Sequence, residues 1–229
     1  MRLPDGRTLG YAKYGRETGY PLMFIHGYPQ CRFEASALDH IFRQRGIRVI
    51  APERPGFGLS TVQPNRRIMD WPADVQELAH HLSLSRFAIM GSSGGGPYAL
   101  ANGLNTQMAT RRVNDYLLKD QDQHEEPVGE RRAQLLRVLF KPFAQSASLA
   151  AYEAKLLSQD WGIEFGDITY NNLHIWHVGK DWNSPLRITE YYVKRLSNSP
   201  FFTAFEGDTH FTIHRHLDEI LSELILESS

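Results

Sequence analysis

The sequence predicts an α/β protein in which a mostly parallel central sheet is flanked by helices. Short apolar runs typical of buried strands alternate with segments of helical apolar spacing, as where 21–27 is followed by 35–45. Strands separated by helices of this length are typical of a parallel sheet with helical crossovers. The glycine-rich stretch GSSGGG at 91–96 marks a tight connection between one such strand and its helix. We therefore expect functional groups at the carboxyl ends of the strands.

The predicted elements follow one another along the chain. Strands are predicted over 8–15, 21–27, 48–53, 86–90, 173–177 and 201–205. A helix is predicted over 35–45, where Gly46 follows in the C-cap position. A second helix opens at Trp71-Pro72 and runs to Leu82, since proline is well tolerated in a first helical turn. This alternation supports the α/β class.

Composition predicts one packed domain spanning residues 1–229. A hydrophobic content of 41% with 12 Phe, 10 Tyr and 4 Trp argues against disorder. A net charge of −1 gives no attraction to nucleic acid or to anionic lipid, so neither is expected as a partner. The single cysteine, Cys31, rules out an intramolecular disulfide. The ten histidines show no ligand spacing such as HExxH, so neither a metal nor another cofactor is expected.

The N-terminal residues MRLPDGRTLG lack the apolar core of a signal peptide. Nothing in the chain approaches 18 consecutive apolar residues, so no membrane span is expected. We therefore expect a cytoplasmic protein in a reducing compartment. The sequence does not indicate an oligomeric state.

The opening of the helix after 86–90 reads Gly91-Ser92-Ser93-Gly94-Gly95, which fits the G-x-S-x-G nucleophile elbow with Ser93 at its tip. In so tight a turn the residues two before and two after the nucleophile must lack side chains, which accounts for Gly91 and Gly95. The amide of Gly94 is expected at the helix N-terminus, where unpaired N–H groups favour negative charge. The pentapeptide alone also fits a plain glycine-rich turn. A phosphate loop is excluded because no Gly-Lys-Ser/Thr follows.

A serine nucleophile needs a base and an acid, and after such an elbow the acid precedes the histidine in the chain. Asp181 follows the predicted strand 173–177, and His210 follows the predicted strand 201–205. Asp208 is a rival acid, but two residues from His210 it is poorly placed to reach the imidazole, and we interpret it as a turn residue. The remaining histidines of this region are expected in or beside the strand, or on the surface of the last helix: His177, His214 and His216.

The predicted strand 21–27 ends in His26-Gly27-Tyr28-Pro29. Glycine permits a backbone turn that aims the Tyr28 N–H inward, where it would serve as a second oxyanion donor beside Gly94. The same His-Gly pair also fits a simple strand-ending turn.

With these residues in place, the chain resembles the α/β-hydrolase family, in a branch common among fungal and bacterial hydrolases. The segments that carry the resemblance cover most of the chain: LPDGRTLGYAKYG, FIHGYPQCRFEA, APERPGFGLS, DWPADVQELAHHL, GSSGGGPYALA, WGIEF, HVGKDWNSP and EGDTHFTI. The resemblance implies a triad of Ser93, Asp181 and His210 with an oxyanion hole from the amides of Tyr28 and Gly94. A serine nucleophile argues against epoxide hydrolases and haloalkane dehalogenases, which use an aspartate there, although HGYP resembles their oxyanion loop.

The chain departs from the family pattern after the elbow helix. Where the family continues with an apolar strand and a helical cap, residues 105–132 are polar and rich in charge. The stretch 133–157 has mostly helical spacing with Pro142 as a kink, and we interpret about 105–160 as a reduced cap. Either one sheet strand is missing, or LLRVLF at 135–140 takes its place.

The leading hypothesis is a serine hydrolase, resembling a carboxylesterase, that acts on a small-molecule ester, lactone or similar acyl substrate. One alternative is a shortened, non-catalytic protein of the same fold that binds a small molecule or a protein. A second alternative is a lyase or isomerase that uses the same triad without covalent chemistry. The substrate itself cannot be read from the sequence.

Overall fold

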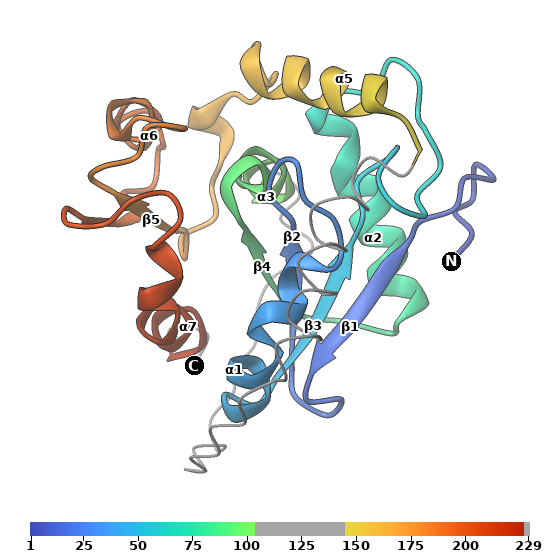
Figure 1. Ribbon diagram of the computed structural model, residues 1–229, viewed down its shortest axis with the longest axis horizontal. Helices are drawn as coiled ribbons and strands as arrows, with labels where there is room; N and C mark the ends of the chain where they lie inside the picture. Colours follow the sequence, from blue (N-terminus) through green and yellow to red (C-terminus); the bar gives the residue numbers. More distant parts are fainter. Residues whose placement is uncertain (104–144, 227–229) are drawn as a thin grey trace. The chain divides into compact units, whose positions relative to one another are not determined.

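The computed structural model describes residues 1–103 and 145–226, and the contacts of the chain cluster into two compact units (Figure 1). Of the described residues, 1–102 and 145–162 belong to the first unit, and 103 and 163–226 belong to the second. Each unit has a sheet of its own among the described strands. The organisation of 1–229 as a single domain stays a prediction.

The first unit contains a four-stranded sheet with the order β1-β3-β2-β4. Its strands are β1 (Tyr11–Gly15), β2 (Tyr20–Ile25), β3 (Ile47–Pro52) and β4 (Ala88–Gly91). β2 lies parallel to both β3 and β4, while β1 pairs with β3 in the antiparallel direction. The predicted fold class, a mostly parallel sheet with flanking helices, is confirmed.

The central strands are the most buried part of this sheet. Leu22, Met23 and Ile25 of β2 and Val49 and Ile50 of β3 are each at most 1% exposed. Strands covered on both faces are continuously apolar, which is why these short runs are readable in the sequence. The parallel pairing places the carboxyl ends of β2 and β4 side by side, since Ile25 lies opposite Gly91. The loops that leave these two ends therefore lie close together.

The predicted strand 8–15 is shorter in the structure, because its first residues pair with a loop. Gly10 N–H donates to Ser60 Oγ at 2.9 Å, and Thr61 N–H donates to the Thr8 carbonyl at 2.9 Å. With these backbone groups occupied by the loop, the pairing of β1 with β3 begins only at Tyr11. The prediction of a strand from residue 8 is wrong by three residues.

Helices and 3-10 turns connect and cover these strands. The predicted helix 35–45 is divided into a 3-10 turn and a short α-helix, and the helix predicted from Trp71 ends one residue early. The elements are η1 (Glu34–Leu38), α1 (Asp39–Gln44), η2 (Ile68–Asp70), α2 (Trp71–His81), η3 (Ser93–Gly95), α3 (Gly96–Gly103) and α5 (Ala147–Ser158). α2 buries Val75, Leu78 and Ala79 on one face, which gives it the apolar spacing by which it was predicted.

The second unit contains a two-stranded parallel sheet of β5 (His174–Val178) and β6 (Phe201–Phe205). Val178 lies opposite Phe205, so both strands end at the same level. The loops that follow them carry Asp181 and His210. The other described elements of this unit are η5 (Phe165–Asp167), α6 (Leu186–Val193), η6 (Ile213–His216) and α7 (Leu217–Leu226).

The two expectations about the missing strand fall largely on undescribed residues. The segment 135–140 and most of the cap-like segment 105–160 lie outside the described residues, and α5 is the part of the latter that is described. Within residues 1–103 and 145–226, β4 ends its sheet, and β5 and β6 form a separate one. Whether a further strand exists stays a prediction.

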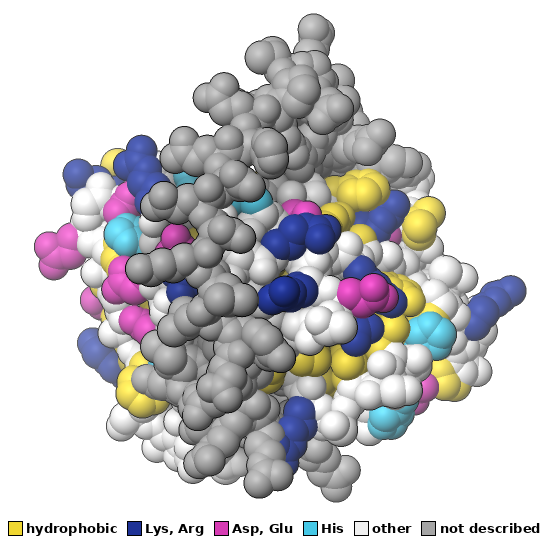
Figure 2. All heavy atoms as spheres, turned by 90° about the horizontal axis from the view of Figure 1, so that it is seen from below, with side chains coloured by type: hydrophobic (Ala, Val, Ile, Leu, Met, Phe, Trp, Pro, Cys, Tyr) yellow, Lys and Arg dark blue, Asp and Glu magenta, His cyan; other side chains and the backbone are white. Residues whose placement is uncertain are grey.

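Charges of both signs occur on the described part of the face drawn in Figure 2, in keeping with a net charge of −1. Among the helices of residues 1–103 and 145–226, none combines the length and the apolar character needed to cross a membrane.

Candidate active site

Ser93 lies at the junction of a strand, a turn and a helix in the first unit. β4 ends at Gly91, and η3 begins at Ser93 and leads into α3. Ser93 has a φ of 47°, in the left-handed region that few residues other than glycine adopt, and its side chain is exposed. Strain of this kind persists only where the surroundings fix it, and it is typical of functional turns. The Ser93 hydroxyl is thereby presented clear of the sheet.

The glycines on either side of Ser93 have no room for a side chain. A Cβ on Gly91 would lie 2.5 Å from the Gly95 carbonyl oxygen. A Cβ on Gly95 would overlap the Ile25 carbonyl oxygen and lie 2.9 Å from that of His26. These neighbours are backbone atoms, which cannot move aside as a flexible side chain can. Both positions therefore require glycine.

The loop after β2 lies against this elbow. A Cβ on Gly27 would lie 3.3 Å from Ser93 Cβ, and a Cβ on Gly94 would lie 3.3 Å from the Tyr28 nitrogen. The Tyr28 nitrogen thus lies close to Gly94, the residue that follows Ser93. The Gly94 amide belongs to the first turn of η3, where N–H groups have no partner within the helix. Two adjacent amides of this kind are suited to holding a developing negative charge.

Glu34 joins the loop to the elbow. Its carboxylate accepts a hydrogen bond from the Gly27 N–H at 2.6 Å and another from Ser92 Oγ at 2.8 Å. The two segments are far apart in the sequence, and one side chain holds them together. Nothing in the sequence indicates this role beyond the position of Glu34 in the segment FIHGYPQCRFEA.

His26 is a structural residue in this arrangement. It is fully buried; its Nδ1 donates to the Gly27 carbonyl at 2.9 Å, and its Nε2 accepts from the Arg54 N–H at 3.3 Å. Burial, together with the positive charge of Arg54, holds the pKa of His26 well below its usual value. His26 is therefore neutral and contributes to the shape of the loop.

A buried ionic cluster behind this loop was missed by the sequence analysis. Arg54, Tyr98 and Glu153 are 0% exposed, and Arg66 is 4% exposed. Arg54 Nε lies 2.8 Å from Glu153 Oε1, while Arg66 pairs with Glu153 Oε2 and donates to Tyr98 Oη at 2.7 Å. Burial raises the pKa of Glu153, but the two arginines outweigh it and hold that pKa below its usual value. The only available signal was Arg54 in ERPGFG, to which no role was assigned.

The second unit brings Asp181 and His210 together. His210 Nδ1 lies 2.8 Å from Asp181 Oδ2, and the Asp181 side chain is 4% exposed. The other carboxylate oxygen accepts the backbone N–H groups of Asn183 and Ser184, each at 2.8 Å. An ionised carboxylate only accepts hydrogen bonds, so His210 Nδ1 carries the proton here. Its Nε2 is then left with a lone pair, as a general base requires.

The environment of Asp181 favours its charged form. Burial raises the pKa of this carboxyl, but the Ser184 N–H and the His210 ring outweigh burial and keep the pKa below its usual value. An ionised partner keeps the imidazole in one tautomer and stabilises its cationic form.

Asp208 and His216 form a separate pair in the same unit. His216 Nε2 lies 2.8 Å from Asp208 Oδ2, and Thr212 Oγ1 donates to Asp208 Oδ1 at 2.7 Å. The His216 ring stacks on Phe205 with the centroids 3.7 Å apart. The expectation that His216 is a surface position on the last helix is therefore wrong: it lies in η6 and packs on the end of β6. Asp208 is more than a turn residue, since it anchors this histidine.

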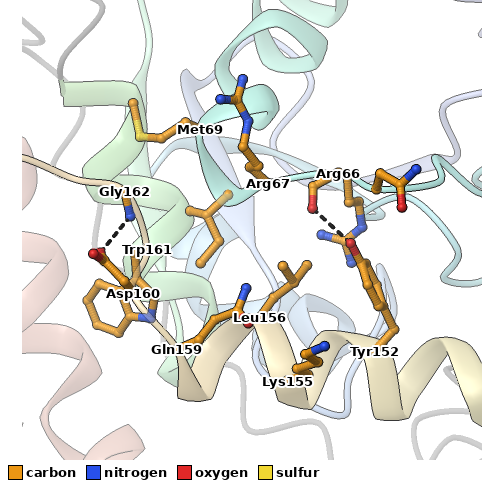
Figure 3. A pocket seen from close by; sticks show the side chains of 12 residues that line it. Arg66, Arg67, Met69, Tyr152, Lys155, Leu156, Gln159, Asp160, Trp161 and Gly162 are labelled. Carbon is orange, nitrogen blue, oxygen red and sulfur yellow. Dashed lines mark hydrogen bonds between the residues drawn. The ribbon is translucent and has the colours of Figure 1, made fainter.

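A cavity of about 510 Å³ lies in the first unit beside α5 (Figure 3). Its lining combines the cations Arg67 and Lys155 with Met69 and Trp161. In Figure 3, Tyr152 points to the backbone of Arg66, whose carbonyl accepts its hydroxyl at 3.0 Å. Ser93, Tyr28 and Gly94 do not line this cavity, which is separate from the elbow. In the described part of the chain, no three His, Cys, Asp or Glu side chains converge as a metal site would require.

The fold and this elbow define a class: α/β proteins that carry a serine on a strained turn between a strand and a helix. Comparison with known proteins identifies the fold. Residues 20–114 match the family model described as the alpha/beta hydrolase fold. An esterase from Exiguobacterium antarcticum superposes with a TM-score of 0.70 at 17% identity, over 98% of this chain and 97% of that one. The chain therefore has the α/β-hydrolase fold.

Curated relatives match over a shorter stretch. A non-heme haloperoxidase from Rhodococcus erythropolis is 36% identical over 93 residues, which are 40% of this chain and 33% of that protein. A non-heme chloroperoxidase from Streptomyces lividans is 34% identical over 93 residues, 40% of this chain and 34% of the relative. The chain thus matches only about a third of the length of these relatives.

Proposed function

We propose that the protein is a serine hydrolase of esters, lactones or similar acyl substrates. The observation that carries the proposal is Ser93 at a φ of 47°, with the amides of Tyr28 and Gly94 beside it. The hydrogen-bonded pair of Asp181 and His210 supports it, since this pair has the donor and acceptor arrangement of a general base and its orienting acid. Esterases among the structural neighbours share the fold.

In the proposed reaction Ser93 Oγ attacks the acyl carbon while His210 Nε2 takes its proton. The negative oxygen that develops is held by the amides of Tyr28 and Gly94. His210 returns the proton to the leaving group, and Asp181 stabilises the imidazolium in the meantime. Water, activated by the same histidine, then releases the acyl group. The proposal requires that His210 Nε2 come within hydrogen-bond reach of Ser93 Oγ.

Covalent labelling with a fluorophosphonate, followed by mass spectrometry, tests this proposal. We expect phosphonylation of Ser93 in the wild type and none in Ser93→Ala. Ser83→Ala is a matched control, because Ser83 is also an exposed serine with a positive φ, of 54°. Failure of Ser93 to react between about pH 6 and pH 9, where a neutral histidine base works, would contradict the proposal and favour the non-catalytic alternative.

A further inference from the structure

The two peptide groups that follow β2 are held in position by side chains from outside the loop. Arg54 donates to the His26 carbonyl through Nη1 and to the Gly27 carbonyl through Nη2, the latter at 3.1 Å. The Gly27 carbonyl accepts two more hydrogen bonds, from His26 Nδ1 at 2.9 Å and from the Gln30 N–H at 3.1 Å. On the opposite side, the Gly27 N–H donates to Glu34 at 2.6 Å.

The Gly27 carbonyl determines where the Tyr28 amide points. In a planar trans peptide, the C=O of one residue and the N–H of the next point in opposite directions. With the Gly27 carbonyl directed at Arg54, the Tyr28 N–H is directed away from Arg54, and the Tyr28 nitrogen lies 3.3 Å from the position of a Cβ on Gly94. Among the described residues no acceptor is bonded to the Tyr28 N–H. The amide is thus left free for a ligand oxygen.

Arg54 itself has little freedom to move. Its guanidinium is fully buried, pairs with Glu153 of α5 at 2.8 Å, and lies over the Tyr98 ring at 4.9 Å from the centroid. A guanidinium has five N–H donors in a rigid plane, so one side chain can hold two carbonyls and a carboxylate at once. α5 also reaches the site directly, since a Cβ on Gly94 would lie 2.9 Å from Leu157 Cδ1.

We propose that Arg54 is the positioning residue that sets the orientation of the Gly27–Tyr28 peptide, and that Glu153 makes this orientation depend on α5. The role of this orientation in catalysis rests on the proposed function. The orientation of the peptide itself is independent of that function. Without Arg54, the Gly27 carbonyl loses its charged donor. Only the two neutral donors, the His26 ring and the Gln30 N–H, then remain on this carbonyl. Because Gly27 has no Cβ to restrict its backbone, we expect the peptide to rotate and the Tyr28 N–H to turn out of the site.

The kinetic test compares Arg54→Met with the wild type on p-nitrophenyl acetate. Methionine keeps the unbranched stem of the side chain and removes every donor. We expect kcat to fall about 10²-fold, the scale of one lost oxyanion donor. KM should change little, because the negative oxygen exists only in the transition state. Arg54→Lys should recover part of kcat, since an ammonium restores one of the two carbonyl contacts.

A control variant separates positioning from folding. In Arg54→Met, Glu153 keeps its pairing with Arg66, so no buried charge is left without a partner. Arg7→Met is the matched control: it breaks the Arg7–Asp74 pair of the same unit, which has contacts of 2.6 and 2.9 Å, and should leave kcat unchanged. If the folded Arg54 variants lose no more kcat than Arg7→Met, the proposal is overturned.

A crystal structure of Arg54→Met gives a readout that does not depend on activity. We expect the Gly27 carbonyl to have rotated, with the Tyr28 N–H turned away from Ser93. An unrotated peptide would overturn the proposal. If the wild type hydrolyses no ester and its Ser93 does not react, the proposed function fails, while the orientation of this peptide still decides the role of Arg54. Should Arg54→Met not fold, Arg54→Lys undergoes the same two measurements: a kcat below that of Arg7→Met together with a displaced Gly27 carbonyl supports the proposal, and wild-type kcat with an unmoved carbonyl overturns it.

Discussion

Asp181 and Asp208 lie on adjacent loops of the second unit, and each carboxylate holds a different histidine. Asp181 contacts His210 and Asp208 contacts His216, both at 2.8 Å. The loops are joined by the Lys180 N–H, which donates to the Asp208 carbonyl at 3.0 Å. Each side chain is therefore committed to its own partner, and at the scale of single residues this geometry favours Asp181 as the acid of the proposed triad.

Asp181→Asn tests that assignment. An amide in place of the carboxylate neither fixes the productive tautomer of His210 nor stabilises its cation, so we expect kcat to fall by up to about 10⁴-fold. Asp208→Asn is the matched control, since it removes the charge beside His216 and should change kcat by less than about tenfold. Steady-state kinetics on p-nitrophenyl acetate measure both. The reverse result would mean that Asp208 is the acid.

The same carboxylate contributes to acid stability. The pKa of Asp181 is lowered in the folded protein, so its contribution to stability is complete above the pKa of the unfolded chain, about 3.9. That contribution is lost as the pH falls through the folded pKa. We expect the free energy of unfolding to fall more steeply below about pH 4 in the wild type than in Asp181→Asn. Urea titrations across this range measure it, and parallel curves for the two proteins would contradict the prediction.

At the scale of elements, the segment 88–103 is a strand, a turn and a helix that share one steric constraint. The turn is so tight that α3 begins directly beside the end of β2, and backbone atoms of Ile25 and His26 fill the space where a side chain on Gly95 would lie. The constraint is local to the turn and its neighbouring strand. The positions of the glycines in the sequence therefore predict this tight turn directly.

Gly95→Ala and Gly96→Ala form a matched pair of adjacent substitutions. A methyl group on Gly95 meets two backbone carbonyls, whereas one on Gly96 meets nothing within 4 Å. We expect Gly95→Ala to destabilise the protein by about 1–3 kcal/mol, the usual cost of overpacking. Gly96→Ala should be neutral or stabilising, since alanine is the better helix former. Thermal unfolding measures both, and equal melting temperatures would mean that 91–95 is not the tight turn described.

At the scale of the whole molecule, the proposed reaction draws on both units. Ser93 and the two amides belong to the first unit, and Asp181 and His210 belong to the second. A triad works only as a set, so the loss of one member should leave little for the loss of another to remove. This gives a test that needs only activity measurements.

We expect Ser93→Ala and His210→Ala each to abolish most of kcat, and the double variant to be no worse than the poorer single one. His214→Ala serves as the control, because His214 is exposed and its ring contacts only the Phe211 carbonyl within the described residues. Losses that multiply in the double variant would show that the two residues act independently.

The sequence by itself determined the α/β class, the elbow and the positions of its glycines, because each depends on contacts between near neighbours in the chain. It also separated Asp181 from Asp208, since two residues are too few for a side chain to turn back onto His210. Only the tertiary structure decided what holds the loop after β2, because Arg54, Glu34 and Glu153 come from three separate segments. Their pairing depends on which strand ends lie side by side and on where α5 packs. Contacts between side chains that are far apart in the sequence leave no local pattern, such as an apolar periodicity, from which they could be predicted. A buried ion pair requires only that two distant charged side chains come into contact in the folded chain.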